Sequence, residues 1–454
     1  MKLSLCLTAL TLFSASACKD DTGLTGDDGP EPDAAPQPDA PPGVTRVDVE
    51  AGDITTDTTW TKDKLYTLRG YVFVTRGTLT IEPGTVIQGD SGSALAIGQD
   101  AKVHAVGTAA EPIVFTSSSP TPAAGNWGGL VLLGKAPINV TGGTNLVEGF
   151  ATSFGDRVRY GGTNAAHDCG TLKYVRVEYA GFELAPGNEL NGITLGACGT
   201  ATEIDFVQSH LGLDDGIEVF GGTVNLKHIV ISAPDDDGLD WDLGWTGKVQ
   251  FAIIQQRSGI GDKGIEADNH PSVFTATPRS APEIWNLTLI GGDSPIAKRQ
   301  GGMHLRRGTA GKIANAIVAY WNQFPIDVDS FDSASQYGTA MSVKHTYFVK
   351  ATAQPDLWPA SFDVSNGNQN DCQAPNTNCF DELATIGGDA TNHMNVDPQL
   401  GDPKHVATPS FVPNAGSPVL TGCGTPPAGL DTTATFCGAI GATDWTAGWT
   451  RFGD

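Results

Sequence analysis

The amino-acid sequence predicts an all-β protein in which one chain winds into a single-stranded parallel β-helix, with loops projecting from the coils. A short acidic stretch recurs three times, with central glycines at positions 216, 238 and 264. The intervals of 22 and 26 residues between these glycines are typical of one turn of a solenoid. The composition agrees, because 57 Gly and 28 Pro with only 17% charged residues indicate many short strands and turns.

The first segment, residues 1–17, is predicted to be a secretory signal peptide, since a basic start is followed by an apolar run and small residues. Cys18 comes directly after the small residues and resembles the lipidated cysteine of bacterial lipoproteins. Ordinary signal cleavage nearby is the alternative. Residues 18–45 hold six Pro and seven acidic residues, which predicts a disordered tether. We therefore expect export to the bacterial cell envelope. Attachment to the outer membrane is expected through lipid rather than through a membrane span.

The β-helix is expected over residues 46–454, and its first strands alternate apolar and polar residues at 71–74 and 77–87. Five later strands share one pattern and start at Glu203, Asn225, Lys248, Glu283 and Lys312. The two longest intervals between these starts predict loops at 268–282 and 293–300, on a face that meets a partner. A β-sandwich is the rival fold, but it would need antiparallel strands at shorter and more regular spacing.

Six cysteines remain after Cys6 leaves with the signal peptide and Cys18 takes lipid, an even number in an exported chain. Cys372 with Cys379 and Cys423 with Cys437 are natural local pairs. Cys169 would then pair with Cys198, 29 residues away and about one coil along the solenoid. Other connectivities stay open, because spacing alone does not fix them.

Nine segments carry a resemblance to known proteins: Leu79–Ile87, Asn126–Leu130, Gly134–Asn139, Tyr160–Gly162, Leu172–Arg176, Asn188–Gly192, Phe220–Asn225, Met303–Arg307 and Asp444–Thr450. Through them the chain, over roughly residues 50–454, resembles a family of exported and often lipid-anchored bacterial β-helix proteins of mostly unassigned activity. The resemblance implies a right-handed β-helix and carries over no catalytic residue. A separate stretch, 411–418, resembles the last coil of many β-helix proteins, so we expect the C-terminal segment to close the solenoid.

Aligning the three acidic repeats by their glycines stacks acidic residues on neighbouring coils, about 4.8 Å apart. Two apolar columns, one of them Ile217, Leu239 and Ile265, then point inward. Ten carboxyl groups and the ammonium of Lys263 gather on one outward patch. We call these ten groups the acidic ladder: Asp214, Asp215, Glu218, Asp236, Asp237, Asp240, Asp242, Asp262, Glu266 and Asp268.

Like charges stacked in this way are destabilising, so something must offset them. A bound cation is one solution, and Ca²⁺ is the natural choice for an oxygen-rich site in an exported protein. Protonated carboxyl groups with the raised pKa of a general acid are a second solution. A third is that the side chains splay into solvent and accept hydrogen bonds from turn amides. The repeats lack the loop pattern of an EF-hand.

An enzymatic interpretation uses Asp214, Asp215, Asp237 and Glu266 as the catalytic carboxyl groups of a glycan hydrolase. The stretch Asp214–Ile217 resembles the paired-Asp motif of polygalacturonase-type hydrolases, although their Gly-His-Gly motif is absent. A lyase would need a basic side chain beside Ca²⁺, for which Lys263, Arg306 and Arg307 are candidates. Ordinary charge pairing with the ladder is the alternative role for these three residues.

A formal net charge of −24 argues against nucleic acid as a partner. The nine His are scattered, and His228 and His304 are expected to be packed or solvated. The first functional hypothesis is a non-enzymatic, monomeric surface lipoprotein that is stabilised by Ca²⁺ and binds a glycan or protein ligand. The alternatives are a β-helical polysaccharide hydrolase or lyase, and a purely structural envelope protein.

Overall fold

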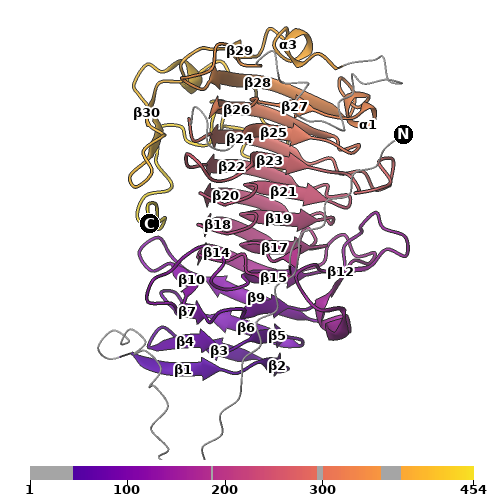
Figure 1. Ribbon diagram of the computed structural model, residues 1–454, viewed down its shortest axis with the longest axis vertical. Coiled ribbons are helices and arrows are strands. Elements are labelled where there is room, and N and C mark those ends of the chain that lie inside the picture. Colours follow the sequence, from indigo (N-terminus) through magenta and orange to yellow (C-terminus); the bar gives the residue numbers. More distant parts are fainter. Residues whose placement is uncertain (1–43, 186–187, 294–299, 359–379) are drawn as a thin grey trace, which may run out of the picture. The chain divides into compact units, whose positions relative to one another are not determined.

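The computed structural model describes residues 44–454, except for 186–187, 294–299 and 359–379. In this part the chain winds into a right-handed parallel β-helix, which confirms the predicted fold class (Figure 1). Two long sheets, A and B, run along the stack of coils, and most coils contribute one strand to each of them, while the first coils add a second strand to sheet A. The signal peptide, Cys18 and the tether fall outside the described residues and stay predictions.

Sheet A is the larger of the two, and its stacked strands are β1 (Thr45–Val49), β4 (Lys64–Leu68), β7 (Val86–Gly89), β10 (Ile113–Ser117), β14 (Gly170–Glu178), β18 (Glu203–His210), β20 (Asn225–Ser232), β22 (Lys248–Gln255), β24 (Glu283–Ile290), β26 (Gly311–Trp321), β28 (Met341–Lys350) and β29 (His393–Met394). A branch of this sheet holds β3 (Thr58–Trp60), β6 (Gly77–Ile81) and β9 (Ala101–Val106).

Sheet B carries the acidic repeats, and its strands are β2 (Gly52–Ile54), β5 (Tyr71–Val74), β8 (Ala94–Ile97), β11 (Leu130–Leu133), β17 (Ile193–Gly196), β19 (Ile217–Phe220), β21 (Leu239–Asp242), β23 (Lys263–Ala267), β25 (Gly301–Leu305) and β27 (Asp327–Val328). Three short antiparallel pairs are β12 (Asn145–Leu146) with β13 (Arg159–Tyr160), β15 (Glu183–Ala185) with β16 (Asn188–Glu189), and β30 (Leu400–Asp402) with β31 (Ser410–Pro413). The helical turns are η1 (Thr152–Val158), α1 (Phe331–Ala334), α3 (Glu382–Thr385) and η2 (Pro418–Leu420).

The core lies inside the coils and is built from the inward columns that the sequence predicts. Ile217, Leu239 and Ile265 are successive partners on β19, β21 and β23, and each is at most 1% exposed. The repeated glycines are required because neighbouring coils come very close to them. A Cβ added at Gly216 would lie 2.3 Å from the Cγ2 of Ile231 and 2.8 Å from the carbonyl oxygen of Gly238.

The predicted loop at 268–282 lies between β23 and β24, and of the loop at 293–300 the residues 294–299 lie outside the described part of the chain. The five predicted strands of one type are β18, β20, β22, β24 and β26, which are consecutive neighbours in sheet A. The longer intervals in the sequence are therefore insertions between coils, and the coil-to-coil pairing continues past them.

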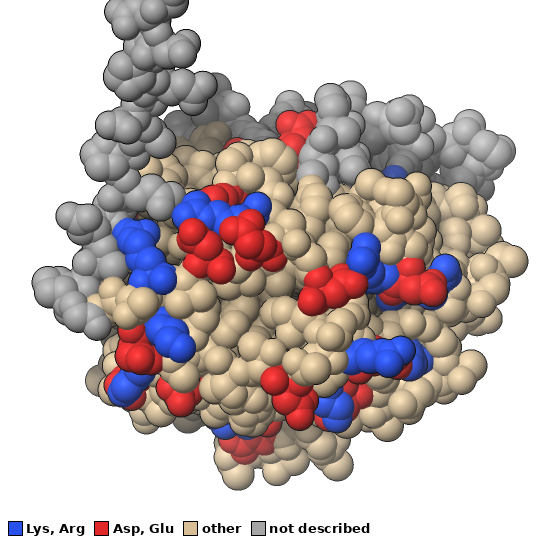
Figure 2. All heavy atoms as spheres, turned by 90° about the horizontal axis from the view of Figure 1, so that it is seen from below, with Lys and Arg blue, Asp and Glu red and all other residues tan. Residues whose placement is uncertain are grey.

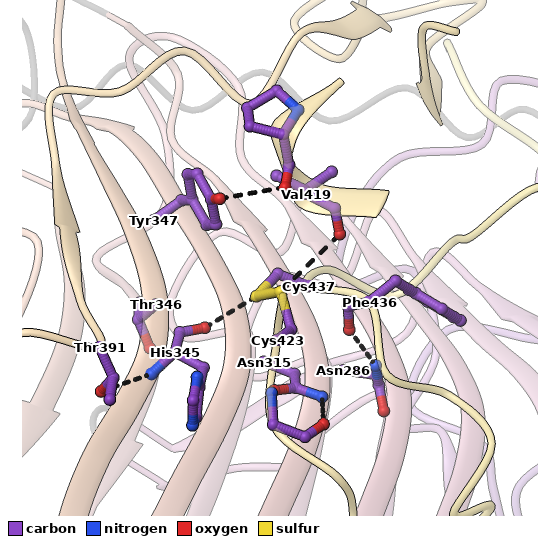
Figure 3. Close-up of a disulfide and its surroundings, with 12 residues drawn as sticks. Asn286, Asn315, His345, Thr346, Tyr347, Thr391, Val419, Cys423, Phe436 and Cys437 are labelled. Carbon is purple, nitrogen blue, oxygen red and sulfur yellow. Dashed lines mark hydrogen bonds between the residues drawn. A yellow bond between two sulfur atoms is a disulfide. The ribbon is translucent and has the colours of Figure 1, made fainter. Parts of the chain in front are cut away.

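The C-terminal segment differs from the prediction that residues 411–418 close the solenoid as a last coil. β31 pairs antiparallel with β30, and the chain then runs back along the outer face of sheet A (yellow in Figure 1). Figure 3 shows how this segment is held, with Asn286 donating to the carbonyl oxygen of Phe436 at 2.7 Å and Tyr347 to that of Pro418 at 3.1 Å. The apolar side chain of Phe411 is buried against this face rather than on the end of the core, which explains the difference.

The disulfides Cys169–Cys198 and Cys423–Cys437 are both present, as predicted. The pair Cys372 and Cys379 lies outside the described residues. Cys169 and Cys198 are fully buried, and the bond joins positions 29 residues apart. Cys423–Cys437 closes a loop of the C-terminal segment over sheet A (Figure 3).

The end of the solenoid at β1 carries charged side chains of both signs in contact with one another (Figure 2). Arg69, for example, lies 2.7 Å from carboxylate oxygens of both Asp48 and Asp90. This end is therefore locally neutralised, unlike the acidic ladder. Among the described residues, no helix is both long and apolar enough to cross a bilayer.

Candidate functional site

The acidic ladder forms on sheet B as predicted, because β19, β21 and β23 pair without a shift in register. Glu218 is the partner of Asp240, and Asp240 is the partner of Glu266. The same outward column continues on the next two coils with His304 and Asp327. Five ionisable side chains from five coils thus form one continuous row.

A second row lies on the turns that enter these strands. An oxygen of Asp215 accepts a hydrogen bond from the backbone N–H of Asp237 at 2.9 Å, and an oxygen of Asp237 accepts one from that of Lys263. Each of these aspartates is thereby fixed by the next coil through one oxygen. Its second oxygen and the remaining lone pair of the first oxygen are available to a ligand.

Eight of the ten ladder residues come close enough to share a cation. They form four overlapping groups of three, in each of which one carboxylate oxygen per residue lies within 4.8 Å of the others. Asp242 and Asp268 belong to none of the groups found among the described residues. The groups are Asp214, Asp215 and Asp236; Asp215, Glu218 and Asp240; Asp236, Asp237 and Asp262; and Asp237, Asp240 and Glu266.

Parts of the ladder are buried, because segments from earlier in the chain cover it. Glu218 is 7% exposed, and its carboxylate accepts a hydrogen bond from the amide of Asn191 at 2.5 Å. The Asn191 amide oxygen is buried with no hydrogen-bond partner among the described residues. Glu148, from the segment between β12 and η1, also contacts Glu218. The sequence repeats contain no signal for these contacts.

Burial keeps several of these carboxyl groups from ionising readily. Desolvation, followed by repulsion from neighbouring acids, holds the pKa of Asp215, Glu218, Asp237 and Asp240 well above the ordinary value. Burial, together with repulsion from Asp236, raises the pKa of Asp214 to about 7. This part of the ladder therefore gains from either a proton or a cation.

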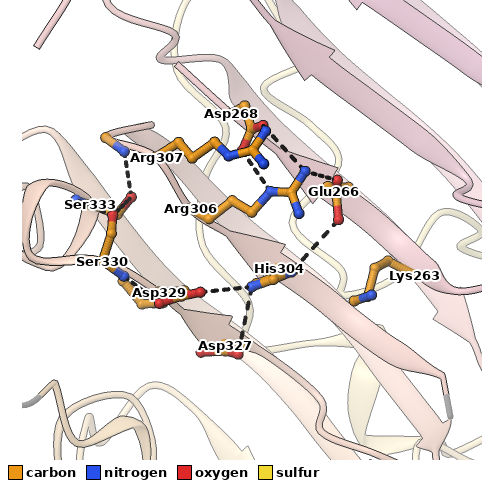
Figure 4. Close-up of polar contacts among 12 residues, drawn as sticks. Lys263, Glu266, Asp268, His304, Arg306, Arg307, Asp327, Asp329, Ser330 and Ser333 are labelled. Carbon is orange, nitrogen blue, oxygen red and sulfur yellow. Dashed lines mark hydrogen bonds and ion pairs between the residues drawn. The ribbon is translucent and has the colours of Figure 1, made fainter. Parts of the chain in front are cut away.

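The other end of the ladder is neutralised by basic side chains (Figure 4). Arg306 pairs with Glu266 and also donates to Asp268 at 2.8 Å. His304 lies between Glu266 and Asp329, at 3.7 and 3.4 Å from their oxygens. Although burial raises the pKa of Glu266, the hydrogen bond to His304 and the charge of Arg306 outweigh it and lower that pKa to about 2.

The basic candidates named from the sequence are all engaged with acids. Lys263 lies 2.6 Å from Asp262, and Arg307 lies 2.7 Å from Asp268. Burial lowers the pKa of Lys263 and Arg306, but the surrounding carboxylates outweigh it and leave both pKa values raised. Lys263 and Arg306 therefore hold their protons and are poorly suited to act as a general base.

His304 was predicted to be packed or solvated, and it is buried, but it also lies in the row of ladder side chains. Burial lowers its pKa, yet hydrogen bonds to Asp329 and Glu266 raise that pKa to about 9. The sequence held one signal, since His304 follows a glycine pair that continues the glycine column. The interval of 35 residues between the strand starts at Lys248 and Glu283 breaks the period, so the sequence does not predict that His304 pairs with Glu266. His228 is packed as expected, stacked between Phe206 and Phe251.

Comparison with known families agrees with this architecture. The model of the pectate-lyase-like β-helix domain matches residues 52–391, about three quarters of the chain. The chain belongs to this pectate-lyase-like β-helix family. Among curated proteins and among solved structures, none matches the chain. The matched range of this pectate-lyase-like chain includes every residue of the acidic ladder.

Proposed function

We propose that this pectate-lyase-like β-helix binds a divalent cation, Ca²⁺ foremost, on the acidic ladder and binds a glycan through it. The observation that carries the proposal is the set of four overlapping groups of three carboxylates, with oxygens within 4.8 Å of one another. Ca²⁺ takes six to eight oxygen ligands in flexible geometry, so three carboxylates would leave positions for other oxygens. Hydroxyl and carboxylate groups of a glycan are suitable ligands for those positions.

The ladder supports binding better than it supports lyase chemistry. A lyase would abstract a proton with a basic side chain near the cation. Lys263, Arg306 and Arg307 instead lie in ion pairs with Asp262, Glu266 and Asp268. The primary proposal is therefore a non-enzymatic, exported binding protein, attached to the bacterial envelope through lipidated Cys18.

A glycan hydrolase is the second candidate, and one observation favours it. Asp237 and Glu266 share a group of close carboxylates, yet their pKa values are moved in opposite directions. A carboxyl group that stays protonated beside one that stays ionised is the pairing that glycoside hydrolysis needs. Asp214 and Asp215, on the preceding coil, would then take part in holding the sugar.

Isothermal titration calorimetry of the metal-free protein with Ca²⁺ tests whether the acidic ladder binds the cation. We expect a dissociation constant on the order of 10⁻⁴ M, in the range of extracellular calcium sites. The substitution Asp237→Asn removes a charged ligand that belongs to two of the groups, so it should weaken binding at least tenfold, by our rough estimate. Asp156→Asn is the control, since its side chain is 90% exposed and lies outside the ladder. Absence of a saturable signal in the unaltered protein would remove calcium from the proposal.

A panel of polysaccharides separates the two candidates. For a binding protein we expect Ca²⁺-dependent retardation on polysaccharide gels that EGTA abolishes, without release of reducing ends. For a hydrolase, reducing ends should appear and should be lost in both Asp237→Ala and Glu266→Gln. Cleavage of this kind would overturn the non-enzymatic proposal, and no retention by any polysaccharide would favour a structural envelope role.

A further inference from the structure

A cavity of about 360 Å³ lies between sheet A and the C-terminal segment, whereas the ladder strands belong to sheet B. Its floor is the start of β20 and β22, and its outer wall is residues 429–431. Its size matches the lower end of the range for small-molecule sites. The cavity is therefore large enough for one monosaccharide-sized ligand.

The outer wall is held firmly against the floor. Gln250 accepts a hydrogen bond from the backbone N–H of Asp431 at 2.7 Å and donates to its carbonyl oxygen at 3.1 Å. Gly429 has a φ of +92°, and a Cβ added there would lie 3.3 Å from the ammonium of Lys248. The turn at Gly429 thus brings backbone polar groups close to a charged side chain, and the cavity is preformed.

Two ammonium groups line this cavity in a chain whose net charge is −24. Lys248 contacts the carbonyl oxygen of Ala428 at 3.1 Å and a carboxylate oxygen of Glu283 at 3.2 Å. Lys227 is exposed and lies within 4.0 Å of no carboxylate in the described part of the chain. Hydrogen bonds from Thr433 and, after them, the charge of Lys227 nevertheless lower the pKa of the nearby Asp431 carboxylate. Asp205, its partner on the preceding coil, lies instead within reach of His228 and Lys173.

The remaining lining groups suit hydroxyl groups. The amide oxygen of Asn225 accepts from the backbone N–H of Lys248 at 2.8 Å, and its NH₂ group donates no hydrogen bond within the described part of the chain. The carboxylate of Asp431 accepts from Thr433 through one oxygen, at 2.6 Å from its hydroxyl and 2.9 Å from its backbone N–H. Its other oxygen remains an acceptor. Donors, acceptors and two ammonium groups thus surround one small space.

We propose that this cavity binds a sugar acid, meaning a small molecule with one carboxylate on a polyhydroxylated carbon frame. The carboxylate would lie between Lys227 and Lys248, and the hydroxyl groups would reach Asn225 and Asp431. An inorganic anion would leave most of the space and the hydroxyl-binding groups unused. The site needs no metal, so it does not rest on the function proposed for the acidic ladder.

Titrations in excess EGTA with D-gluconate, D-glucuronate, sorbitol and inorganic phosphate test this site, followed by calorimetry or ligand-observed NMR. At least one of the two sugar acids should bind with a dissociation constant on the order of a millimolar, which is typical for a ligand of this size. Which of them binds tells whether the frame is open or cyclic. Sorbitol lacks the carboxylate and should bind at least about tenfold more weakly.

The variant Lys227→Met should weaken sugar-acid binding at least about tenfold, because it removes an ammonium group that faces the cavity, and the exposed position tolerates methionine. Lys312→Met is the matched control. Like Lys248, Lys312 pairs with Glu283, at 3.4 Å, but it does not line the cavity. Its substitution should therefore leave sugar-acid binding unchanged. Equal binding of sorbitol or phosphate, no binding of either sugar acid, or equal loss in both variants would each overturn the proposal.

Discussion

The metal-free protein is expected to become less stable as the pH rises from 5 to 8, and Ca²⁺ is expected to restore the loss. The cause is the set of ladder carboxyl groups whose folded-state pKa is raised. Burial, with repulsion from neighbouring acids, raises the pKa of Asp214 to about 7 and, with a smaller opposing hydrogen bond, that of Asp242 to about 7. Burial, followed by repulsion from neighbouring acids, also holds the pKa of Asp215, Glu218, Asp237 and Asp240 well above the ordinary value.

The sign of the effect follows from proton binding. Between the ordinary pKa of 3.8 and about 7, the folded chain keeps protons on Asp214 and Asp242 that the unfolded chain has released. Since the folded state binds more protons, its stability is full below the unfolded pKa and falls as the pH rises through the folded value. Each group contributes on the order of a few kcal/mol, so we expect the melting temperature to fall by roughly 10 °C.

Two groups at the neutralised end modify this profile. The raised pKa of His304, about 9, contributes stability below its ordinary value of 6.5, which is lost as the pH rises through 9. The lowered pKa of Glu266, about 2, contributes stability above 4.5, which is lost as the pH falls through 2. The metal-free protein should therefore be most stable near pH 5, where both contributions are present and the ladder carboxyl groups with a raised pKa keep their protons.

Differential scanning fluorimetry in EGTA and in millimolar Ca²⁺ across this pH range measures the effect. A bound cation favours the ionised carboxylates, so the two curves should separate increasingly as the pH rises. Asp237→Asn should flatten the metal-free curve, because an amide cannot ionise. An equal melting temperature of the metal-free protein at pH 5 and pH 8 would contradict this prediction. It would show that solvent screens the repulsion between the ladder carboxylates.

The part of the site that sequence could predict is the part where coils have nearly equal length. Glycines 22 and 26 residues apart fix the register of β19, β21 and β23, and the stacking of Glu218, Asp240 and Glu266 follows from it. The next coil contains an insertion before β24, so the sequence period no longer reveals that His304 continues the row. The spacing of a repeat in the sequence predicts which residues stack only where no insertion lies between the coils.

Contacts between the ladder and distant segments of the chain could not be predicted from the sequence, for a different reason. Asn191 and Glu148 meet Glu218 from outside the acidic repeats, and no spacing rule places them there. The C-terminal segment likewise attaches to sheet A through side chains such as Asn286 and Gln250, which bond to its backbone. Polar side chains that bind another segment's main chain leave no periodic pattern, so the sequence suggested a closing coil instead.

The substitution Arg306→Met is expected to lower the free energy of unfolding by about 4 kcal/mol. Arg306 bridges two mostly buried carboxylates, since the side chains of Glu266 and Asp268 are 13% and 7% exposed. Removing one partner of a buried ion pair typically costs about 3–5 kcal/mol, because it leaves an uncompensated charge. Methionine keeps much of the side-chain volume, so the loss should report mainly on charge.

Arg307→Met is the matched control, because Arg307 also pairs with Asp268 but is more exposed, at 27%, and contacts one carboxylate there. We expect it to cost about 1 kcal/mol or less, and urea unfolding followed by tryptophan fluorescence measures both variants. If the cost in Arg306→Met comes from an unpaired charge, adding Asp268→Asn to that variant should recover part of the stability. Equal losses in the two single variants, or a further loss in the double variant, would mean that Arg306 stabilises the coil by packing and that the neutralised end of the ladder does not depend on its charge.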